Sequence, residues 1–193
     1  MRPGAAGLAR GVAGGGQRRR RPFRLSAPDH AELAPWPYDI SQLTDGTDEP
    51  GEPSDPANDC GPTSIAACLQ YLTGHRPHAD DIRDAIYGQG YRGYTYAVDL
   101  ADYVTHMWGL AAEARQDAHP ALTIRAALAH GWPVVALTQE PGYTHFCPIT
   151  AFDRDGVTRH QVLGGRREWL TWQDWTARYL GWLIVVTSRR VDG

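Results

Sequence analysis

The chain has 193 residues, a pI of about 6.2 and a formal net charge of −3, and its seven Trp and nine Tyr indicate a folded domain. The three cysteines, at positions 60, 68 and 147, show no framework spacing, which excludes a disulfide scaffold and is compatible with a reducing compartment. Paired CxxC and HExxH motifs are absent from the sequence, so we expect no metal and no organic cofactor.

The first thirty residues differ from the rest in charge. Residues 1–30 carry seven Arg and one Asp, a net of +6, whereas residues 31–193 carry twelve Arg and twenty-one acidic residues, a net of −9. Gly and Arg interrupt residues 1–30 throughout, so this stretch lacks the apolar core of a secretory signal. We expect a disordered basic arm over 1–30 and one domain over 31–193. The charge of the arm also suits nucleic-acid binding, an alternative that we do not favour.

The sequence also bears on where in the cell the protein is found. No stretch approaches the length of a membrane span, so we expect no membrane-spanning segment. Without a recognisable signal peptide we expect a cytoplasmic protein, although this observation leaves secretion open. Nothing in the composition indicates an oligomeric state.

The first predicted elements after the arm are mostly helical. A short extended segment over 36–43 leads into a loop over 44–59, which has six acidic residues and no basic one and should lie on the surface. Apolar residues at helical spacing then predict four helices, with a short strand or connector over 111–115 between the last two. These helices cover 60–72, 79–87, 96–110 and 123–130.

From Trp132 the apolar period becomes strand-like. Asp155-Gly156 predicts a hairpin turn over 153–156. Helices followed by strands indicate an α+β fold, in which the helix over 60–72 packs on an antiparallel sheet. The expected strands cover 132–138, 144–152, 157–163 and 182–187, and a short helix covers 171–179.

The sequence places Cys60 at the start of the central predicted helix. Pro62 suits the first turn, Thr63 and Ser64 offer capping hydroxyls, and Gly74 supplies a left-handed stop. The positive end of the helix dipole favours thiolate over thiol at Cys60, and a thiolate is the nucleophilic form. Cys60 is therefore a candidate for covalent catalysis, the alternative being a cysteine that packs as a small hydrophobe.

A cysteine nucleophile needs a base, and His145 is the best placed of the eight histidines. It opens a predicted strand just after the turn at Gly142. Cys147 lies two residues further on the same strand face and could approach the site, but a buried apolar role explains it more simply. Cys68, two turns into the central helix, is expected in the core. The run of Gly and Tyr over 87–96 could form the wall of a cleft.

The stretch Asn58-Asp59-Cys60-Gly61-Pro62-Thr63-Ser64-Ile65-Ala66 resembles the nucleophile motif of papain-like cysteine peptidases of family thirty-nine. That family includes the domains that cut bacteriocin leader peptides after a double-glycine site, and it has freestanding relatives. The resemblance extends from about Trp36 to Val186. It implies a papain-like fold and a peptide or protein substrate. In the freestanding relatives a Ser-Gln pair ends a short strand, and Ser41-Gln42 matches it, which implies that Gln42 builds the oxyanion hole.

The second half of the chain carries the rest of the resemblance. Residues 143–146, containing His145, resemble the family's histidine segment, and residues 169–175 resemble its closing helix. The sequence departs from the family at the residue that orients the histidine, which is usually Asp or Asn on the strand after the turn. Gln161 falls at that position and can accept a hydrogen bond from an imidazole. Asp153 in the turn is the fallback orienter.

The resemblance implies a cysteine peptidase, with Cys60 as the nucleophile and His145 as base and then acid. A cysteine amidase, a peptidoglycan hydrolase or an acyltransferase could use the same pair. A catalytically silent papain-like domain that binds a peptide or a partner is the alternative from another class. The missing Asp or Asn at position 161 is the feature that favours it.

Overall fold

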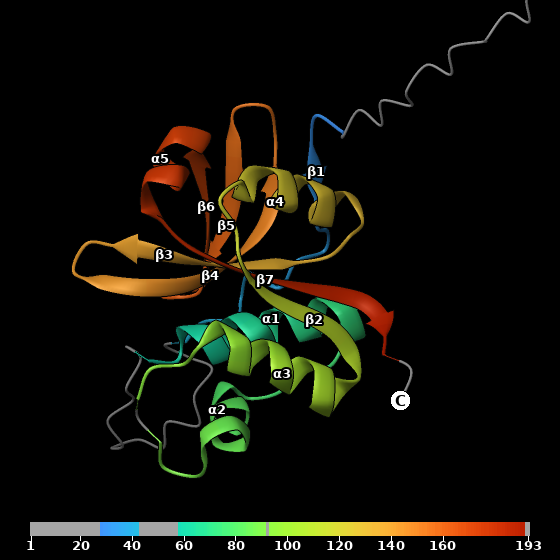
Figure 1. Cartoon of the computed structure of the whole chain (residues 1–193), viewed down its shortest axis with the longest axis vertical. Helices are drawn as coiled ribbons and strands as arrows, with labels where there is room; N and C mark the ends of the chain where they lie inside the picture. The colour runs from blue at the N-terminus through green and yellow to red at the C-terminus, as the bar shows by residue number, and fades with distance from the viewer. Residues whose placement is uncertain (1–27, 43–57, 92, 192–193) are drawn as a thin grey trace, which may run out of the picture.

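The computed structural model describes residues 28–42, 58–91 and 93–191 of the chain (Figure 1). Most of the arm expected over 1–30 and the acidic loop up to residue 57 lie outside the described residues. In chain order the elements are β1 (Ala31–Glu32), α1 (Cys60–Thr73), α2 (Ala79–Tyr87), α3 (Ala97–Trp108), β2 (Leu110–Gln116), α4 (Pro120–Ala129), β3 (Val134–Glu140), β4 (Tyr143–Phe152), β5 (Gly156–Gln161), β6 (Arg166–Thr171), α5 (Trp172–Arg178) and β7 (Tyr179–Arg190).

The strands form one antiparallel sheet in the order β2-β7-β3-β4-β5-β6, and β1 pairs with β4. Strand β4 is central: it pairs with β3 through a tight turn at Gly142 and with β5 through the turn at 153–156. Helices α1, α2 and α3 lie on one side of the sheet, and α4 and α5 lie on the other (Figure 1). The arrangement confirms the expected α+β fold, with β1 and β2 preceding α4 and with α5 preceding the last strand.

Helix α1 is the most deeply buried element of the helical layer. Every residue from Cys60 to Leu69 is buried, as expected of a helix that packs on several sides. The helix ends where the sequence predicts, because Gly74 adopts a φ of 75° and its N–H donates to the carbonyl of Gln70 at 2.8 Å. No helix among the described residues is long and apolar enough to cross a membrane.

Several boundaries differ from the sequence expectation. Residues 36–42 form a turn and not an extended segment, since the N–H of Tyr38 donates to the carbonyl of Trp36 at 3.0 Å. Strand β6 was not expected, because its residues are mostly polar and it lies at the edge of the sheet. Helix α4 begins at Pro120 and not at Thr123, since proline fits the first helical turn.

Candidate active site

Cys60 is the first residue of α1, and its thiol contacts the sheet. Its Sγ accepts a hydrogen bond from the backbone N–H of Phe146 at 3.5 Å. That N–H belongs to the peptide bond between His145 and Phe146, so α1 delivers the thiol to the position on β4 that carries the histidine. The hydroxyl of Ser64 reinforces this docking by donating to the carbonyl of Phe146 at 3.2 Å. Two segments that lie 85 residues apart in the sequence therefore meet at one point.

Burial governs the charge state of the Cys60 thiol. The residue is 7% exposed, and desolvation raises the pKa of Cys60 to about 11. The N–H groups of Phe146 and Gly61 act in the opposite direction, but their effect is smaller. The expectation of a thiolate at the helix start is therefore wrong, because loss of hydration outweighs the helix dipole. Cys60 rests as a neutral thiol at pH 7.

The carboxylate beside Cys60 is neutralised from α2. Asp59 is the N-cap residue of α1, yet its side chain makes no capping hydrogen bond. It forms an ion pair with Arg83, a buried arginine that also pairs with Asp80. The expected capping by Thr63 and Ser64 is wrong for both residues: the hydroxyl of Ser64 donates to β4, and Oγ1 of Thr63 has no hydrogen-bond partner among the described residues. Arg83 was not singled out from the sequence, and its position on the inner side of an amphipathic helix would have been the signal.

His145 is held inside the protein next to the thiol. It is 1% exposed, its backbone carbonyl accepts from the hydroxyl of Thr138 at 3.1 Å, and its ring meets Tyr143 edge to face at 5.8 Å. Burial lowers the pKa of His145 to about 4, while Gln161 acts in the opposite direction. The imidazole is therefore neutral at pH 7, which is the form that a general base requires.

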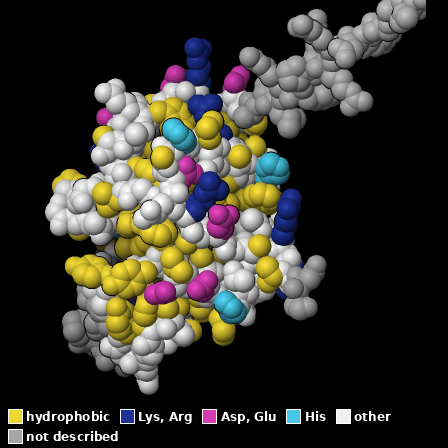
Figure 2. Space-filling view, in the orientation of Figure 1, with side chains coloured by type: hydrophobic (Ala, Val, Ile, Leu, Met, Phe, Trp, Pro, Cys, Tyr) yellow, Lys and Arg dark blue, Asp and Glu magenta, His cyan; other side chains and the backbone are white. Residues whose placement is uncertain are grey.

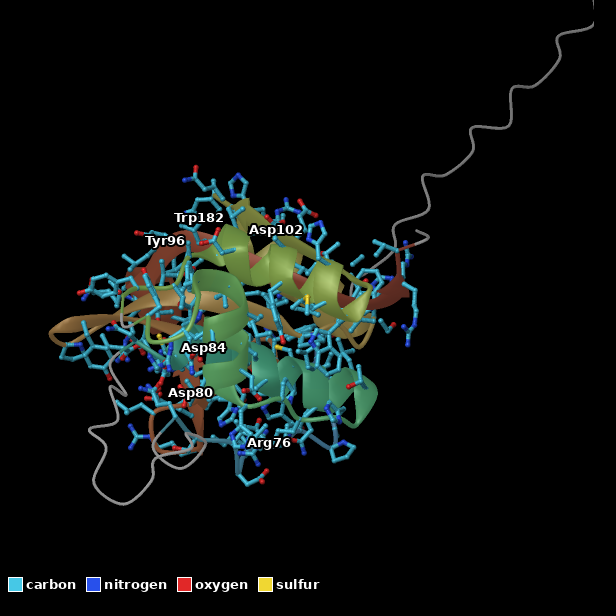
Figure 3. The ribbon with its side chains drawn as sticks, turned by 90° about the horizontal axis from the view of Figure 1, so that it is seen from below. Arg76, Asp80, Asp84, Tyr96, Asp102 and Trp182 are labelled. Carbon is cyan, nitrogen blue, oxygen red and sulfur yellow. The ribbon has the colours of Figure 1, made fainter. Side chains whose placement is uncertain are left out.

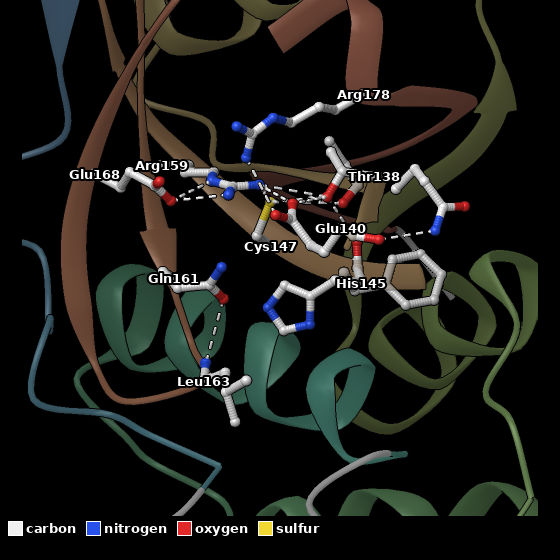
Figure 4. Close-up of polar contacts among 12 residues, drawn as sticks. Thr138, Glu140, His145, Cys147, Arg159, Gln161, Leu163, Glu168 and Arg178 are labelled. Atoms are coloured by element: carbon white, nitrogen blue, oxygen red, sulfur yellow. Dashed lines mark hydrogen bonds and ion pairs between the residues drawn. The ribbon is translucent and has the colours of Figure 1, made fainter. Parts of the chain in front are cut away.

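Gln161 faces His145 across the sheet. Figure 4 shows its side chain directed towards the imidazole from β5, and its Oε1 accepts from the N–H of Leu163 at 3.4 Å. Its contact with His145 raises the histidine pKa but does not reach hydrogen-bond geometry, since Nε2 of His145 has no hydrogen-bond partner among the described residues. In this part of the chain no hydrogen bond joins the imidazole to the thiol of Cys60 either. The imidazole therefore faces Gln161, while the thiol of Cys60 contacts the backbone one residue further along β4.

Asp153, the fallback orienter, is at the wrong end of β4. It lies in the turn after the strand, eight residues beyond His145, which corresponds to about 25 Å of extended chain. Its Oδ1 accepts from the N–H groups of Asp155 and Gly156, both at 2.8 Å. Asp153 therefore shapes the hairpin turn and does not orient His145.

Gln42, the expected oxyanion residue, is buried and is held against the end of β5. It is 5% exposed, and its backbone N–H donates to the carbonyl of Val162 at 3.0 Å. This contact places Gln42 one residue away from Gln161 across the pairing. The turn over 36–42, and not a strand end, presents the side chain.

A buried ion-pair network lies behind His145, and the sequence did not indicate it. Arg159 is 1% exposed and pairs with Glu140 on β3 and with Glu168 on β6 (Figure 4). Arg178 from α5 also contacts Glu140 at 3.2 Å. Cys147 is buried, as expected, and its Sγ lies 3.9 Å from Nη1 of Arg159. The only signal of this network in the sequence was Arg159, a single arginine within a predicted strand. Its partners Glu140 and Glu168 lie 19 and 9 residues away.

A pocket of about 320 Å³ opens beside the thiol. Its walls come from the segment before α3, the start of α3, and the strands β3, β4 and β7. Tyr94, Tyr96 and Val98 are exposed side chains of this wall. Hydrophobic side chains gather on one face of the molecule (Figure 2). Tyr96 and Trp182, which both line the pocket, are labelled in Figure 3. Part of the Gly and Tyr run over 87–96 thus forms a cleft wall, as the sequence predicts. The lining residues are Asn58, Cys60, Tyr94, Thr95, Tyr96, Ala97, Val98, Leu137, Thr144, Phe146 and Trp182.

The three cysteines are free and buried, and Cys68 lies in the core as expected. Among the described residues, no three His, Cys, Asp or Glu side chains are grouped so that they could hold a metal ion. The chemistry that this region can support therefore rests on the thiol, the imidazole and the amides around them.

Comparisons with known proteins bear on the same region. The family model "Peptidase_C39 like family" matches residues 39–180. A C39-like peptidase from Bacillus anthracis has a TM-score of 0.61 at 17% identity, covering 85% of this chain and 100% of that one. No curated protein sequence shows a significant match.

Two further solved structures are similar at lower identity. The peptidase domain of Streptococcus ComA, a bi-functional ABC transporter involved in a quorum-sensing pathway, has a TM-score of 0.55 at 13% identity, covering 68% of this chain and 93% of that one. A double-glycine-motif protease from an AMS/PCAT transporter, solved with the leader peptide, has a TM-score of 0.51 at 15% identity. The match covers 66% of this chain and 82% of that one. These likenesses confirm the papain-like fold.

Proposed function

We propose, from the premise that this chain belongs to the Peptidase_C39 like family, that it hydrolyses peptide bonds as a cysteine peptidase. One observation carries the proposal: the thiol of Cys60, at the start of α1, contacts the peptide N–H that follows His145 at 3.5 Å. The nucleophile thereby lies at the edge of an apolar pocket and contacts the backbone beside its proposed base. Such a pairing is what covalent catalysis by cysteine requires.

The mechanism starts from two neutral groups. His145 takes the proton of the Cys60 thiol as the sulfur attacks the substrate carbonyl, and a C–S bond forms. His145 then gives that proton to the departing amine, which leaves as the C–N bond breaks. Water, deprotonated by His145, hydrolyses the thioester and restores the thiol.

Two groups are proposed to stabilise the oxyanion. The N–H of Cys60 belongs to the first turn of α1, where N–H groups have no intrahelical partner; the first helical bond runs from the N–H of Thr63 to the carbonyl of Asp59 at 2.9 Å. The side-chain amide of Gln42 is the second donor, in line with the family resemblance of Ser41-Gln42. Gln161 orients His145 in the absence of an Asp or Asn at this position.

The proposed substrate is a peptide. The pocket beside Cys60 is lined by aromatic and aliphatic side chains, and a segment in extended form could pass along the exposed wall formed by Tyr94 and Tyr96. The AMS/PCAT protease with a similar fold was solved with its leader peptide, which supports a peptide ligand for this fold.

A second candidate function is a catalytically silent domain that binds a peptide in the same pocket. Three observations favour it: the Cys60 pKa of about 11, the glutamine at position 161, and the loose contact between Gln161 and His145. Such a domain would retain the pocket and lose the chemistry.

Cleavage of a peptide library, followed by mass spectrometry, separates the two candidates. We expect the wild type to cleave a subset of peptides, and Cys60→Ala and His145→Ala to lower kcat by about 10³-fold or more. Cys147→Ser is the matched control, because it changes a buried thiol outside the proposed mechanism. Peptide binding that survives Cys60→Ala, without cleavage by the wild type, would establish the silent binding domain and refute the peptidase.

A further inference from the structure

The turn that carries Gln42 is fastened to the end of β5 and to the residues after it. The N–H of Gln42 donates to the carbonyl of Val162 at 3.0 Å, and the hydroxyl of Ser41 accepts from the N–H of Gly164 at 3.2 Å. Gly165 has a φ of 59°, and a Cβ on it would lie 3.1 Å from the carbonyl oxygen of Tyr38. The turn and the strand end therefore approach each other as closely as a glycine allows.

The innermost of these attachments is a hydrogen bond between two buried rings. The indole Nε1 of Trp36 donates to Nδ1 of His160 at 3.1 Å, and His160 is fully buried. The imidazole also meets the rings of Trp36 and Tyr38 edge to face, at 6.3 Å and 5.4 Å. An indole can only donate, so Nδ1 must be an acceptor and the imidazole must be neutral.

His160 is placed to connect this attachment with the catalytic machinery. It lies next to Gln161 on β5, and because side chains alternate along a strand the two residues point to opposite faces. Gln161 faces His145, whereas His160 faces the turn over 36–42 that presents Gln42. One strand thus orients two separate parts of the proposed site.

We propose that His160 is a positioning residue, whose neutral imidazole accepts from Trp36 and holds the turn over 36–42 so that Gln42 is presented to the oxyanion. The role of Gln42 rests on the proposed peptidase function. Protonation of His160 places a proton on Nδ1, so this nitrogen can no longer accept a hydrogen bond. Its new N–H then repels the indole N–H of Trp36. The turn then loses its innermost attachment, and Gln42 loses its fixed position.

The surroundings of His160 favour the neutral form. Burial lowers the pKa of His160 to about 4; the backbone of Ile40, the charge of Asp39 and the backbone of Tyr38 act in the opposite direction, and His145 adds to the lowering. The titratable and charged groups around His160 are Tyr38 and Asp39 in the turn, and Arg167, its partner on β6. Arg167 in turn pairs with Glu32 of β1 at 3.0 Å, and His145 acts on His160 through space from the other face of the sheet. The attachment is therefore intact at neutral pH and opens only in acid.

Amide hydrogen exchange of Gln42, measured by NMR on the full chain, tests the attachment without any need for activity. We expect His160→Leu and Trp36→Phe each to lower the protection of the Gln42 amide about tenfold at pH 7, because each removes one partner of a buried hydrogen bond. His160→Asn should keep protection near the wild-type value, since its Oδ1 can take the place of Nδ1. In the wild type, protection should fall between pH 6.5 and 4, and in His160→Asn it should not.

Peptide hydrolysis by the same proteins tests the positioning role. We expect His160→Leu and Trp36→Phe to lower kcat about tenfold, with KM changed less than twofold, and His160→Asn to restore kcat. His30→Asn, a change of an exposed histidine, is the matched control. The protection of the Ala66 amide in α1 should stay at the wild-type value, which separates local loosening from global unfolding.

The outcomes distinguish this proposal from the proposed function. Unchanged Gln42 protection in both His160→Leu and Trp36→Phe would overturn the attachment, even if the wild type cleaves peptides. Lost protection with an unchanged kcat would overturn the positioning role. If the wild type cleaves no peptide, the peptidase proposal fails, and the Gln42 protection alone then decides whether His160 positions the turn. If His160→Leu does not fold, Trp36→Phe supplies the same test.

Discussion

Mild acid should destabilise this protein through two buried histidines, His145 and His160. Both have a pKa of about 4 in the folded protein, chiefly because burial disfavours the charged imidazolium. A histidine in the unfolded chain has a pKa of about 6.5. Between these two values the unfolded chain binds more protons than the folded one, so the stability falls as the pH falls. The contribution is complete above pH 6.5 and is lost as the pH decreases towards 4.

The size of the effect follows from the same values. A difference of about 2.5 in pKa corresponds to about 3 kcal/mol for each histidine when it is fully expressed. At pH 5 each histidine should already cost about 2 kcal/mol, so the wild type should lose about 4 kcal/mol of unfolding free energy between pH 7.5 and 5. The buried carboxylate of Glu140, whose pKa is lowered, acts in the same direction but at a lower pH, because unfolded carboxyl groups titrate near 4.

Urea unfolding followed by tryptophan fluorescence at pH 7.5 and 5 measures this loss. His160→Asn and His145→Asn should each lose only about 2 kcal/mol over the same interval, because one titrating group remains. His30→Asn, which is exposed, should behave as the wild type. Equal losses in the wild type and in His160→Asn would refute the reasoning. If His145 instead rests as an imidazolium paired with a Cys60 thiolate, its pKa lies above 6.5, and His145→Asn would not reduce the acid loss.

Three further changes probe the start of α1. Alkylation of Cys60 by iodoacetamide should be about 300-fold slower at pH 7 than that of an unperturbed thiol, and its rate should rise with pH towards a pKa of about 11, as followed by mass spectrometry. Arg83→Gln should lower the unfolding free energy by about 3 kcal/mol in urea titrations, because it leaves the buried Asp59 carboxylate without its partner. Gly61→Ala should cost about 2 kcal/mol, because the new Cβ would lie 2.3 Å from Oγ1 of Thr95.

Each of these changes has its own control. Cys60→Ser reveals any alkylation of the other two thiols, and a rapid Cys60 reaction at pH 7 would contradict the neutral thiol. Arg76→Gln breaks a surface ion pair with Asp39 at 3.6 Å and should cost less than about 1 kcal/mol; an equal cost for both arginines would count against the importance of burial. Thr95→Ala should recover part of the loss in Gly61→Ala, and full additivity of the two changes would show that Thr95 is not the obstacle.

Much of the secondary structure could be predicted because its signals are local. Gly74 ends α1 through its left-handed conformation, and the turn at 153–156 closes the hairpin, with the N–H of Asp153 donating to the carbonyl of Gly156 at 3.0 Å. Strand β6 could not be predicted, since an edge strand of polar residues is specified by its partner β5 and not by its own pattern. The turn over 36–42 was missed for a related reason, because its contacts come from residues about 120 positions later.

The candidate site likewise combines features set by neighbouring residues with features set by residues distant in the sequence. The sequence by itself determined that Cys60 begins a helix and that His145 lies on a strand, because capping residues and apolar periodicity act over a few neighbouring positions. Only the tertiary structure decided that the thiol meets the His145–Phe146 peptide, that Asp153 is remote, and that His160 is bonded to the turn carrying Gln42. It also decided the charge state of Cys60, because desolvation depends on what the folded chain packs around the sulfur and no local pattern records that burial.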